Sequence, residues 1–162
     1  MRALSSLLAI AACALALAGC AADTTDVPSC GGGDASEVCQ VFTIVNEERT
    51  SMGLAPYAWN AELALAAQRH AQDMVDQGYF DHTSLDGRTF ADRAREAGYD
   101  ASPRGENIAA GQRTPEQVMN SWMGSSGHRA NILSTGSNEI GVGLVDFHWV
   151  QVFGQRSTPA GG

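Results

Sequence analysis

The sequence predicts an α+β fold in which helices pack on an antiparallel sheet. Between residues 36 and 133, apolar residues recur at the three- and four-residue intervals of amphipathic helices. Residues 140–145 and 149–153 instead have the short β-branched and aromatic runs of strands, and the three residues between them favour a hairpin. The run at 106–109 is a candidate for a further strand.

The first two helices have clear ends. The first is expected to follow Ser36, because serine is a favoured N-cap residue, and to end at Gly53. Three valines at helical spacing give it one buried face. The second is expected to follow Asn60 and to end at Gly78, since glycine readily adopts the left-handed conformation after a helix.

Two further helices and one helical turn are predicted before the hairpin. The third helix spans about 89–97. The fourth has Thr114 as N-cap, Pro115 in the first helical position and Gln117 as the reciprocal capping partner. Residues 128–133 are expected to add one helical turn. Helices that precede a terminal hairpin are typical of an α+β domain.

Residues 1–19 are predicted to be an export signal. Arg2 precedes an apolar run that ends at Ala18, too short for a membrane span of about 20 residues. Residues 17–20, Leu-Ala-Gly-Cys, resemble the bacterial lipobox, in which the cysteine becomes the acylated first residue of the mature protein. We therefore expect an exported protein with a lipid anchor at Cys20. It would be held at the bacterial cell envelope and face outside the cytoplasm. The alternative is an ordinary secretory signal cleaved near Ala18 or Ala22.

The mature chain is expected to contain one domain. Residues 20–35 have the small and polar composition of a flexible tether, and residues 157–162 that of a tail, which leaves a domain over 36–156. Removal of residues 1–19 takes away one arginine and no acid, so the net charge of the mature chain is −9. Anionic lipid headgroups would repel such a surface, so attachment to a membrane depends on the acyl group.

The charge balance excludes several classes of function. Eighteen acidic residues against ten basic ones give the whole chain a net charge of −8, which argues against a nucleic-acid partner. All ten basic residues are arginine. The absence of lysine excludes Schiff-base catalysis and a P-loop lysine.

Two cysteines remain for the domain once Cys13 is assigned to the signal and Cys20 to the lipid. Cys30 and Cys39 are expected to form a disulfide outside the cytoplasm. Two unpaired thiols are the alternative. A catalytic cysteine is disfavoured, because no histidine lies nearby in the sequence.

Two histidines and one glutamate are candidates for a functional site. His82 and His128 lie beside predicted helix ends, and Glu106 follows a glycine. Two imidazoles and a carboxylate can hold a zinc-like ion or act as general acid and base. The simpler interpretation is three unrelated loop residues. His70 is expected to be a packed, hydrogen-bonded core residue and His148 a solvated residue at the hairpin turn.

An ordered series of segments resembles the bacterial form of the CAP (SCP/PR-1-like) superfamily over about residues 38–155. These segments are Val45–Arg49, Leu54–Asn60, His70–Ala71, Asp81–His82, Gly105–Ile108, Trp122, Gly127–Leu133, Ile140–Gly143 and Trp149–Gly154. The resemblance implies a three-layer α-β-α sandwich with a central antiparallel sheet.

The resemblance also implies a cleft with two histidines and two acidic residues. Three of the four positions match, at His82, Glu106 and His128. The position of the second acid holds Ser125, which is uncharged, so a divalent cation should bind more weakly. Two nearby aspartates, Asp81 and Asp86, could compensate for the missing negative charge.

Three functions remain open at this point. Roles reported across the superfamily include lipid binding, cell-wall or host interaction, channel modulation and proteolysis, and a shared fold cannot choose among them. The first hypothesis is a monomeric binding module whose cleft, Ser125 included, takes an envelope or cell-wall component, a lipid or a peptide. The second is a hydrolase with Glu106 as base and a metal or His128 as electrophile. The third is a structural envelope protein. The one cofactor considered is a divalent metal such as zinc, held by His82 and His128.

Overall fold

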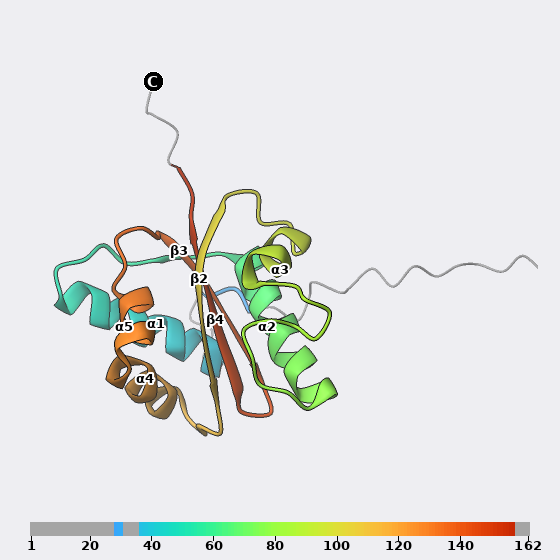
Figure 1. The fold of residues 1–162 in the computed structure, drawn as a ribbon. Coiled ribbons are helices and arrows are strands. Elements are labelled where there is room, and N and C mark those ends of the chain that lie inside the picture. The colour runs from blue at the N-terminus through green and yellow to red at the C-terminus, as the bar shows by residue number, and fades with distance from the viewer. Residues whose placement is uncertain (1–27, 31–35, 158–162) are drawn as a thin grey trace, which may run out of the picture.

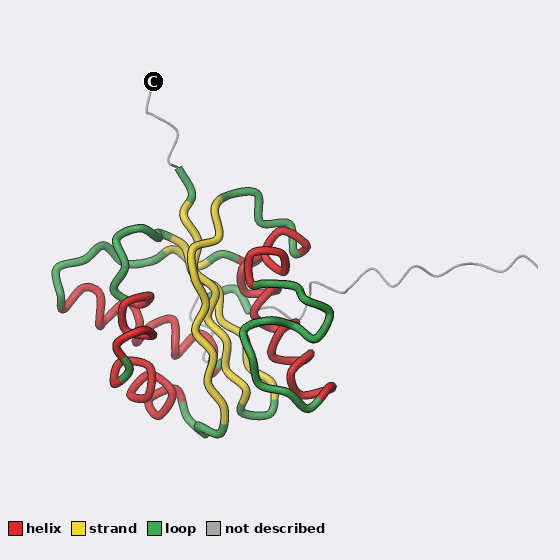
Figure 2. The backbone as a smooth tube through the Cα atoms, viewed as in Figure 1, coloured by secondary structure: helices red, strands yellow, loops and turns green. Residues whose placement is uncertain are grey.

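The computed structural model describes residues 28–30 and 36–157, which form three layers around one sheet (Figures 1 and 2). The sheet contains β1 (Ala58–Trp59), β2 (Ser102–Ala110), β3 (Glu139–Val145) and β4 (His148–Gln155) in the order β1-β3-β4-β2. One face is covered by α1 (Glu37–Ser51), α4 (Pro115–Gly124) and α5 (Ser126–Ile132), and the other by α2 (Ala61–Gln77) and α3 (Phe90–Glu96). The predicted α+β sandwich is therefore confirmed.

The long strands pair antiparallel, as predicted. β4 lies between β2 and β3 and pairs with both. The short β1 pairs in parallel with β3, so the sheet is antiparallel except at this edge. Sequence periodicity could not reveal β1, because two residues are too few to establish an alternation.

The β3–β4 hairpin closes through a tight turn. Asp146 and Phe147 both have positive φ, 42° and 59°, as a two-residue hairpin loop of the favoured type requires. Asparagine and glycine usually occupy such positions, and a bulky aromatic residue there is uncommon. The turn is one residue shorter than the predicted separation, because His148 already belongs to β4.

The helices begin where the capping residues predicted. The Asn60 side chain accepts a hydrogen bond from the Leu63 backbone N–H, and the Thr114 hydroxyl accepts one from Gln117 N–H. One detail differs from the prediction. The Gln117 side chain accepts from the backbone N–H of Arg113, at 2.8 Å, instead of that of Thr114, because it reaches one residue further back.

The predicted disulfide is present. Cys30 and Cys39 are bonded and buried, and they join the start of α1 to the segment before it. The predicted signal at 1–19, the acylation site at Cys20, most of the tether and the tail after residue 157 lie outside the described residues. Within residues 28–30 and 36–157, no helix has the length and apolar character needed to cross a bilayer.

Replacement of both cysteines, in Cys30→Ser/Cys39→Ser, is expected to lower the free energy of unfolding by about 2–3 kcal/mol, because the short loop is no longer closed in the unfolded chain. Urea unfolding of the oxidised wild type and the double variant measures the difference. Reductant should lower the midpoint of the wild type and leave that of the double variant unchanged. Equal midpoints for the two oxidised proteins would contradict the prediction.

Candidate functional site

Glu106 is the centre of the candidate site. It lies on β2, and its side chain is only 1% exposed. Its Oε1 lies 2.9 Å from His82 Nδ1, and its Oε2 accepts a hydrogen bond of 2.7 Å from Arg93 Nη2. Both carboxylate oxygens are therefore already engaged by neighbouring side chains.

His82 lies in the loop after α2 and has a side chain that is 53% exposed. A carboxylate beside a guanidinium can only accept, so Nδ1 carries the proton in the contact with Glu106. The hydrogen bond with Glu106 raises the pKa of His82. Glu106 thus fixes the ring orientation of His82 and leaves Nε2 as the nitrogen that can contact a ligand.

Arg93 completes the arrangement, although the sequence analysis did not single it out. Its guanidinium is buried and donates to the Ser84 hydroxyl, at 3.1 Å, and to the backbone oxygens of Arg88 and His82, at 2.9 and 3.0 Å. The fourth bond goes to Glu106. Arg93 therefore ties the loop that carries His82 to the strand that carries Glu106.

Nothing in the local sequence distinguishes Arg93 from its neighbour Arg95. The two arginines lie two positions apart on α3, and the side chain of Arg95 is 63% exposed, against 4% for Arg93. A buried arginine is a strong signal, because a charged side chain is almost never fully buried without partners. Burial of this kind becomes visible only after the helix is placed against the sheet.

His70 has the structural role predicted for it. The ring is fully buried on α2, and Nε2 donates to the backbone oxygen of Asp81 at 3.0 Å. The same nitrogen lies 4.0 Å from Glu106 Oε1. Burial lowers the pKa of His70, so the ring is neutral and supports the loop before His82.

His128 is the third residue of α5, not a loop residue. Its backbone oxygen accepts a hydrogen bond of 3.1 Å from Asn107 Nδ2. Burial lowers the pKa of His128, and positive charge on His82 lowers it further. Positive charge on His82 thus disfavours protonation of His128.

Asn131 holds α5 against the strand beside Glu106. Its Nδ2 donates to Asn107 Oδ1 at 2.9 Å and to the backbone oxygen of Glu106 at 3.3 Å. A Cβ at Gly105 would lie 3.1 Å from Asn131 Oδ1, so the glycine allows this close approach. Within the Gly-Glu-Asn segment, Gly105 and Asn107 therefore serve the packing of α5 on β2, and Glu106 supplies the carboxylate of the site.

Ser125 and the two aspartates do not join the hydrogen-bonded group around Glu106. Ser125 lies between α4 and α5, where its backbone N–H donates to Trp122 and its backbone oxygen accepts from Arg129. Asp81 accepts from the backbone of Thr83, and Asp86 pairs with Arg88. These aspartates make local contacts, so neither replaces the missing second acid.

The donor set does not fit a resident catalytic zinc. The described part of the chain contains no group of three or more His, Cys, Asp or Glu residues that could hold a metal ion. A catalytic zinc is held by three protein ligands. His82 and His128 supply two imidazoles, and the Glu106 oxygens are engaged by Arg93 and His82.

His82 and His128 are expected to titrate on opposite sides of the ordinary histidine pKa of about 6.5, His82 above it and His128 below it. The raised pKa of His82 stabilises the fold below about pH 6.5, and this contribution is lost as the pH rises through the raised value. The lowered pKa of His128 stabilises the fold above about pH 6.5, and this contribution is lost as the pH falls through the lowered value. NMR titration of the ring protons measures both. Protonation of His128 before His82 on acidification would contradict the assignment.

Comparison with known proteins places the chain in a family. The chain matches the CAP model, described as the cysteine-rich secretory protein family, over residues 42–153. It is 41% identical over 116 residues to the uncharacterized protein YkwD of Bacillus subtilis, a match that covers 70% of this chain and 45% of the relative. The chain thus spans less than half the length of the curated relatives it matches.

Solved structures give the same result. An extracellular protein containing an SCP domain from Bacillus anthracis is 32% identical, with a TM-score of 0.72 over 74% of this chain and 40% of that chain. An outer surface protein of Borrelia burgdorferi is 25% identical, with a TM-score of 0.66 over 76% of this chain and 96% of that chain. The family model covers most of the folded domain, and the layered sheet is shared. The chain belongs to the CAP, or cysteine-rich secretory protein, family.

Proposed function

We propose that the protein is an exported binding domain of the bacterial envelope, and that the cleft of His82, Glu106 and His128 binds an envelope, cell-wall or other extracellular ligand without turnover. One observation carries the proposal. Glu106 is buried with both oxygens engaged, by Arg93 and by His82. A carboxylate held in this way orients an imidazole toward a ligand and is poorly placed to activate water.

The cleft offers hydrogen bonds of both kinds. A protonated His82 donates from Nε2 to a carbonyl, carboxylate or phosphate oxygen, whereas a neutral His128 has one donor and one acceptor nitrogen. Ser125 lies between α4 and α5, outside the hydrogen-bonded group around Glu106, and its uncharged hydroxyl is part of the proposed cleft only as a contact for a large ligand. A polar ligand such as a wall fragment, a peptide or a lipid headgroup suits this set.

The relatives support a location outside the cytoplasm. The similar protein of Bacillus anthracis is described as extracellular, and that of Borrelia burgdorferi as an outer surface protein. The export signal at residues 1–19 and acylation at Cys20 would place this domain, as a monomer, at the outer side of a membrane. Because the mature chain is acidic, the lipid anchor would hold the domain at the membrane, and charge attraction to the bilayer would not.

The proposal is tested by co-sedimentation with purified peptidoglycan and with detergent-solubilised envelope. His82→Ala/His128→Ala is expected to lose most binding, by about tenfold or more, because the exposed ring of His82 and the half-buried ring of His128 are the groups proposed to bond the ligand. His148→Ala, which changes the first residue of β4, is the matched control and should bind like the wild type. Equal binding by all three proteins, or binding by none, would refute the proposal.

A hydrolase is the second candidate, because the contact between His82 Nδ1 and Glu106, at 2.9 Å, has the geometry of an imidazole oriented by a carboxylate. A hydrolase requires turnover of peptide or wall substrates that falls about 10²-fold or more in Glu106→Gln. Ligand binding without turnover in the wild type favours the binding domain.

A divalent ion belongs to this proposal only as an exchangeable ligand of His82 and His128. Zinc would then raise the thermal midpoint of the wild type by mass action, and the two single alanine variants would lose the shift. A midpoint that is unaffected by zinc and by chelator would remove the ion from the proposal.

A further inference from the structure

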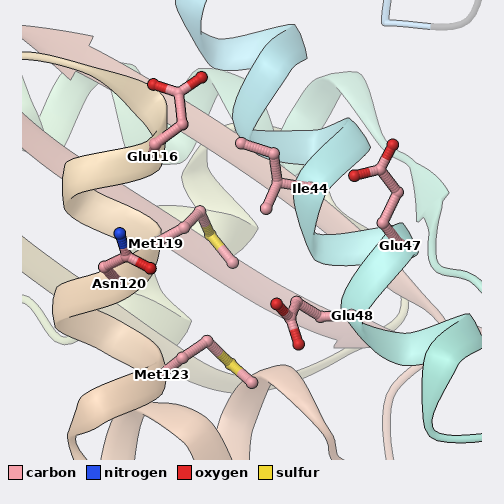
Figure 3. Close-up of a pocket in the computed structure, with 7 residues that line it drawn as sticks. All are labelled: Ile44, Glu47, Glu48, Glu116, Met119, Asn120 and Met123. Atoms are coloured by element: carbon pink, nitrogen blue, oxygen red, sulfur yellow. The ribbon is translucent and has the colours of Figure 1, made fainter.

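A groove lies on the outer surface of the helical layer formed by α1 and α4, away from the loop that carries His82. It encloses about 430 Å³, a volume in the range of small ligand pockets. Its lining residues are Ile44, Glu47, Glu48, Glu116, Met119, Asn120 and Met123 (Figure 3). Nothing in the family match or in the proposed function accounts for this surface.

The spacing of the lining residues explains why a groove forms here. On α1 they lie at positions 44, 47 and 48, and on α4 at 116, 119, 120 and 123. Residues three, four and seven positions apart share one face of a helix. The two helices pack against each other, so one lengthwise face of each borders the same groove. The groove is therefore elongated, over about two helical turns or about 10 Å.

The groove has an apolar floor. Met119 and Met123 extend from α4 toward α1, and Ile44 extends from α1 into the space between the helices (Figure 3). Met119 is buried, whereas Ile44 and Met123 are half-buried. Flexible thioether side chains adapt to partners of irregular shape. The floor can therefore receive an aliphatic or aromatic side chain.

The rim is strongly acidic. Glu48 extends from α1 toward α4 at a level between Met119 and Met123, Glu47 extends from the side of α1 farther from α4, and Glu116 lies at the first turn of α4 (Figure 3). None of these three carboxylates takes part in an ion pair within residues 28–30 and 36–157. Hydrogen bonds with its own backbone N–H and with Thr114 lower the pKa of Glu116, so it stays ionised. The rim thus presents three negative charges around an apolar centre.

We propose that this groove docks a cationic, partly apolar peptide segment of a partner protein, with arginine or lysine at the rim and an apolar side chain on the methionines. Charge decides the class of occupant. A fatty acid or an anionic phospholipid would bring its negative group against three carboxylates, which is repulsive. A basic peptide with apolar side chains can pair its cations with the rim carboxylates and pack its apolar side chains on the methionine floor. The groove is long enough for several peptide residues.

The experiment measures binding of two short synthetic peptides by fluorescence anisotropy. One alternates lysine and leucine, and the other has glutamate in place of lysine. The wild type is expected to bind the lysine peptide and not the glutamate peptide. Glu47→Gln/Glu48→Gln/Glu116→Gln should bind the lysine peptide about tenfold more weakly, since the charge contacts of two exposed carboxylates and of the half-buried Glu48 are lost. Added salt should also weaken binding of the lysine peptide to the wild type, because it screens the attraction between lysine and the carboxylates.

The matched control is Glu62→Gln/Asp76→Asn/Asp146→Asn, which changes the net charge equally but lies on α2 and the hairpin turn. This control should bind the lysine peptide like the wild type. The proposal is overturned by no binding to the wild type, by an equal loss in both triple variants, or by equal binding of the glutamate peptide. Tighter binding of a small polyamine or of an anionic detergent than of the lysine peptide would also overturn it, as would self-association that the groove variant abolishes.

Discussion

Arg93→Met is expected to lower the free energy of unfolding by about 3–5 kcal/mol, the usual cost of removing one partner of a buried ion pair. The reason is Glu106, whose buried carboxylate would lose its 2.7 Å bond to the guanidinium. The hydroxyl of Ser84 and the backbone oxygens of Arg88 and His82 would lose their donor as well. Chemical unfolding of the two proteins gives the difference.

Two further variants show whether the ion pair is the cause. Arg95→Met removes a neighbouring arginine on the same helix, and it should cost under about 1 kcal/mol because that side chain is exposed. Arg93→Met/Glu106→Gln removes both charges and should recover part of the loss. A small loss in Arg93→Met, or a double variant as unstable as the sum of the single variants, would show that the pair does not hold the loop and strand together.

Gly141→Ala is expected to have the second large effect, a loss of about 3 kcal/mol or more in the free energy of unfolding, at the upper end of what overpacking costs. A Cβ at Gly141 would lie 2.0 Å from the backbone nitrogen of Ala64, and one at Gly143 would lie 2.3 Å from that of Gln68. Backbone atoms of a helix cannot yield as a side-chain tip can. The whole of α2 would have to move away from β3.

Gly127→Ala is the matched control for this prediction. No atom lies within 4 Å of a Cβ placed at Gly127, which is inside α5, so alanine should be neutral or slightly stabilising there. Thermal or urea unfolding of the wild type, Gly141→Ala and Gly127→Ala measures the difference in the free energy of unfolding. A Gly141→Ala protein as stable as Gly127→Ala would mean that α2 does not depend on close contact with the strand.

The helix boundaries followed from local sequence. Asn60 and Thr114 cap their helices because a side-chain oxygen meets a backbone N–H only a few residues away. The hairpin followed from two strand-like segments with a very short separation. Signals of this kind depend on neighbours in the chain, so no tertiary information is needed to find them.

The site was only partly predictable. The order of motifs proposed His82, Glu106 and His128, and the structure joins His82 to Glu106, while positive charge on His82 lowers the pKa of His128. Arg93 was missed, because its burial depends on how α3 lies against β2. The sequence analysis offered Glu106 as a metal ligand or a general base, whereas the structure shows its two oxygens engaged by His82 and Arg93.

The groove between α1 and α4 depends still more on tertiary structure. The glutamates of each helix have the appearance of an ordinary solvated face when each helix is considered alone. The packing of α1 beside α4 turns those faces into the rim of one hollow with methionine at its floor.

The sequence by itself determined the class of fold, the ends of the main helices, the hairpin and the disulfide, and it proposed His82 and His128 as site residues. Those features arise from local backbone chemistry or from the order of motifs along the chain. Only the tertiary structure decided that Arg93 neutralises Glu106, that two glycines of β3 admit α2, and that three carboxylates surround one groove. The physical reason is that burial, close approach and charge pairing are properties of residues far apart in sequence, which only the folded chain brings together.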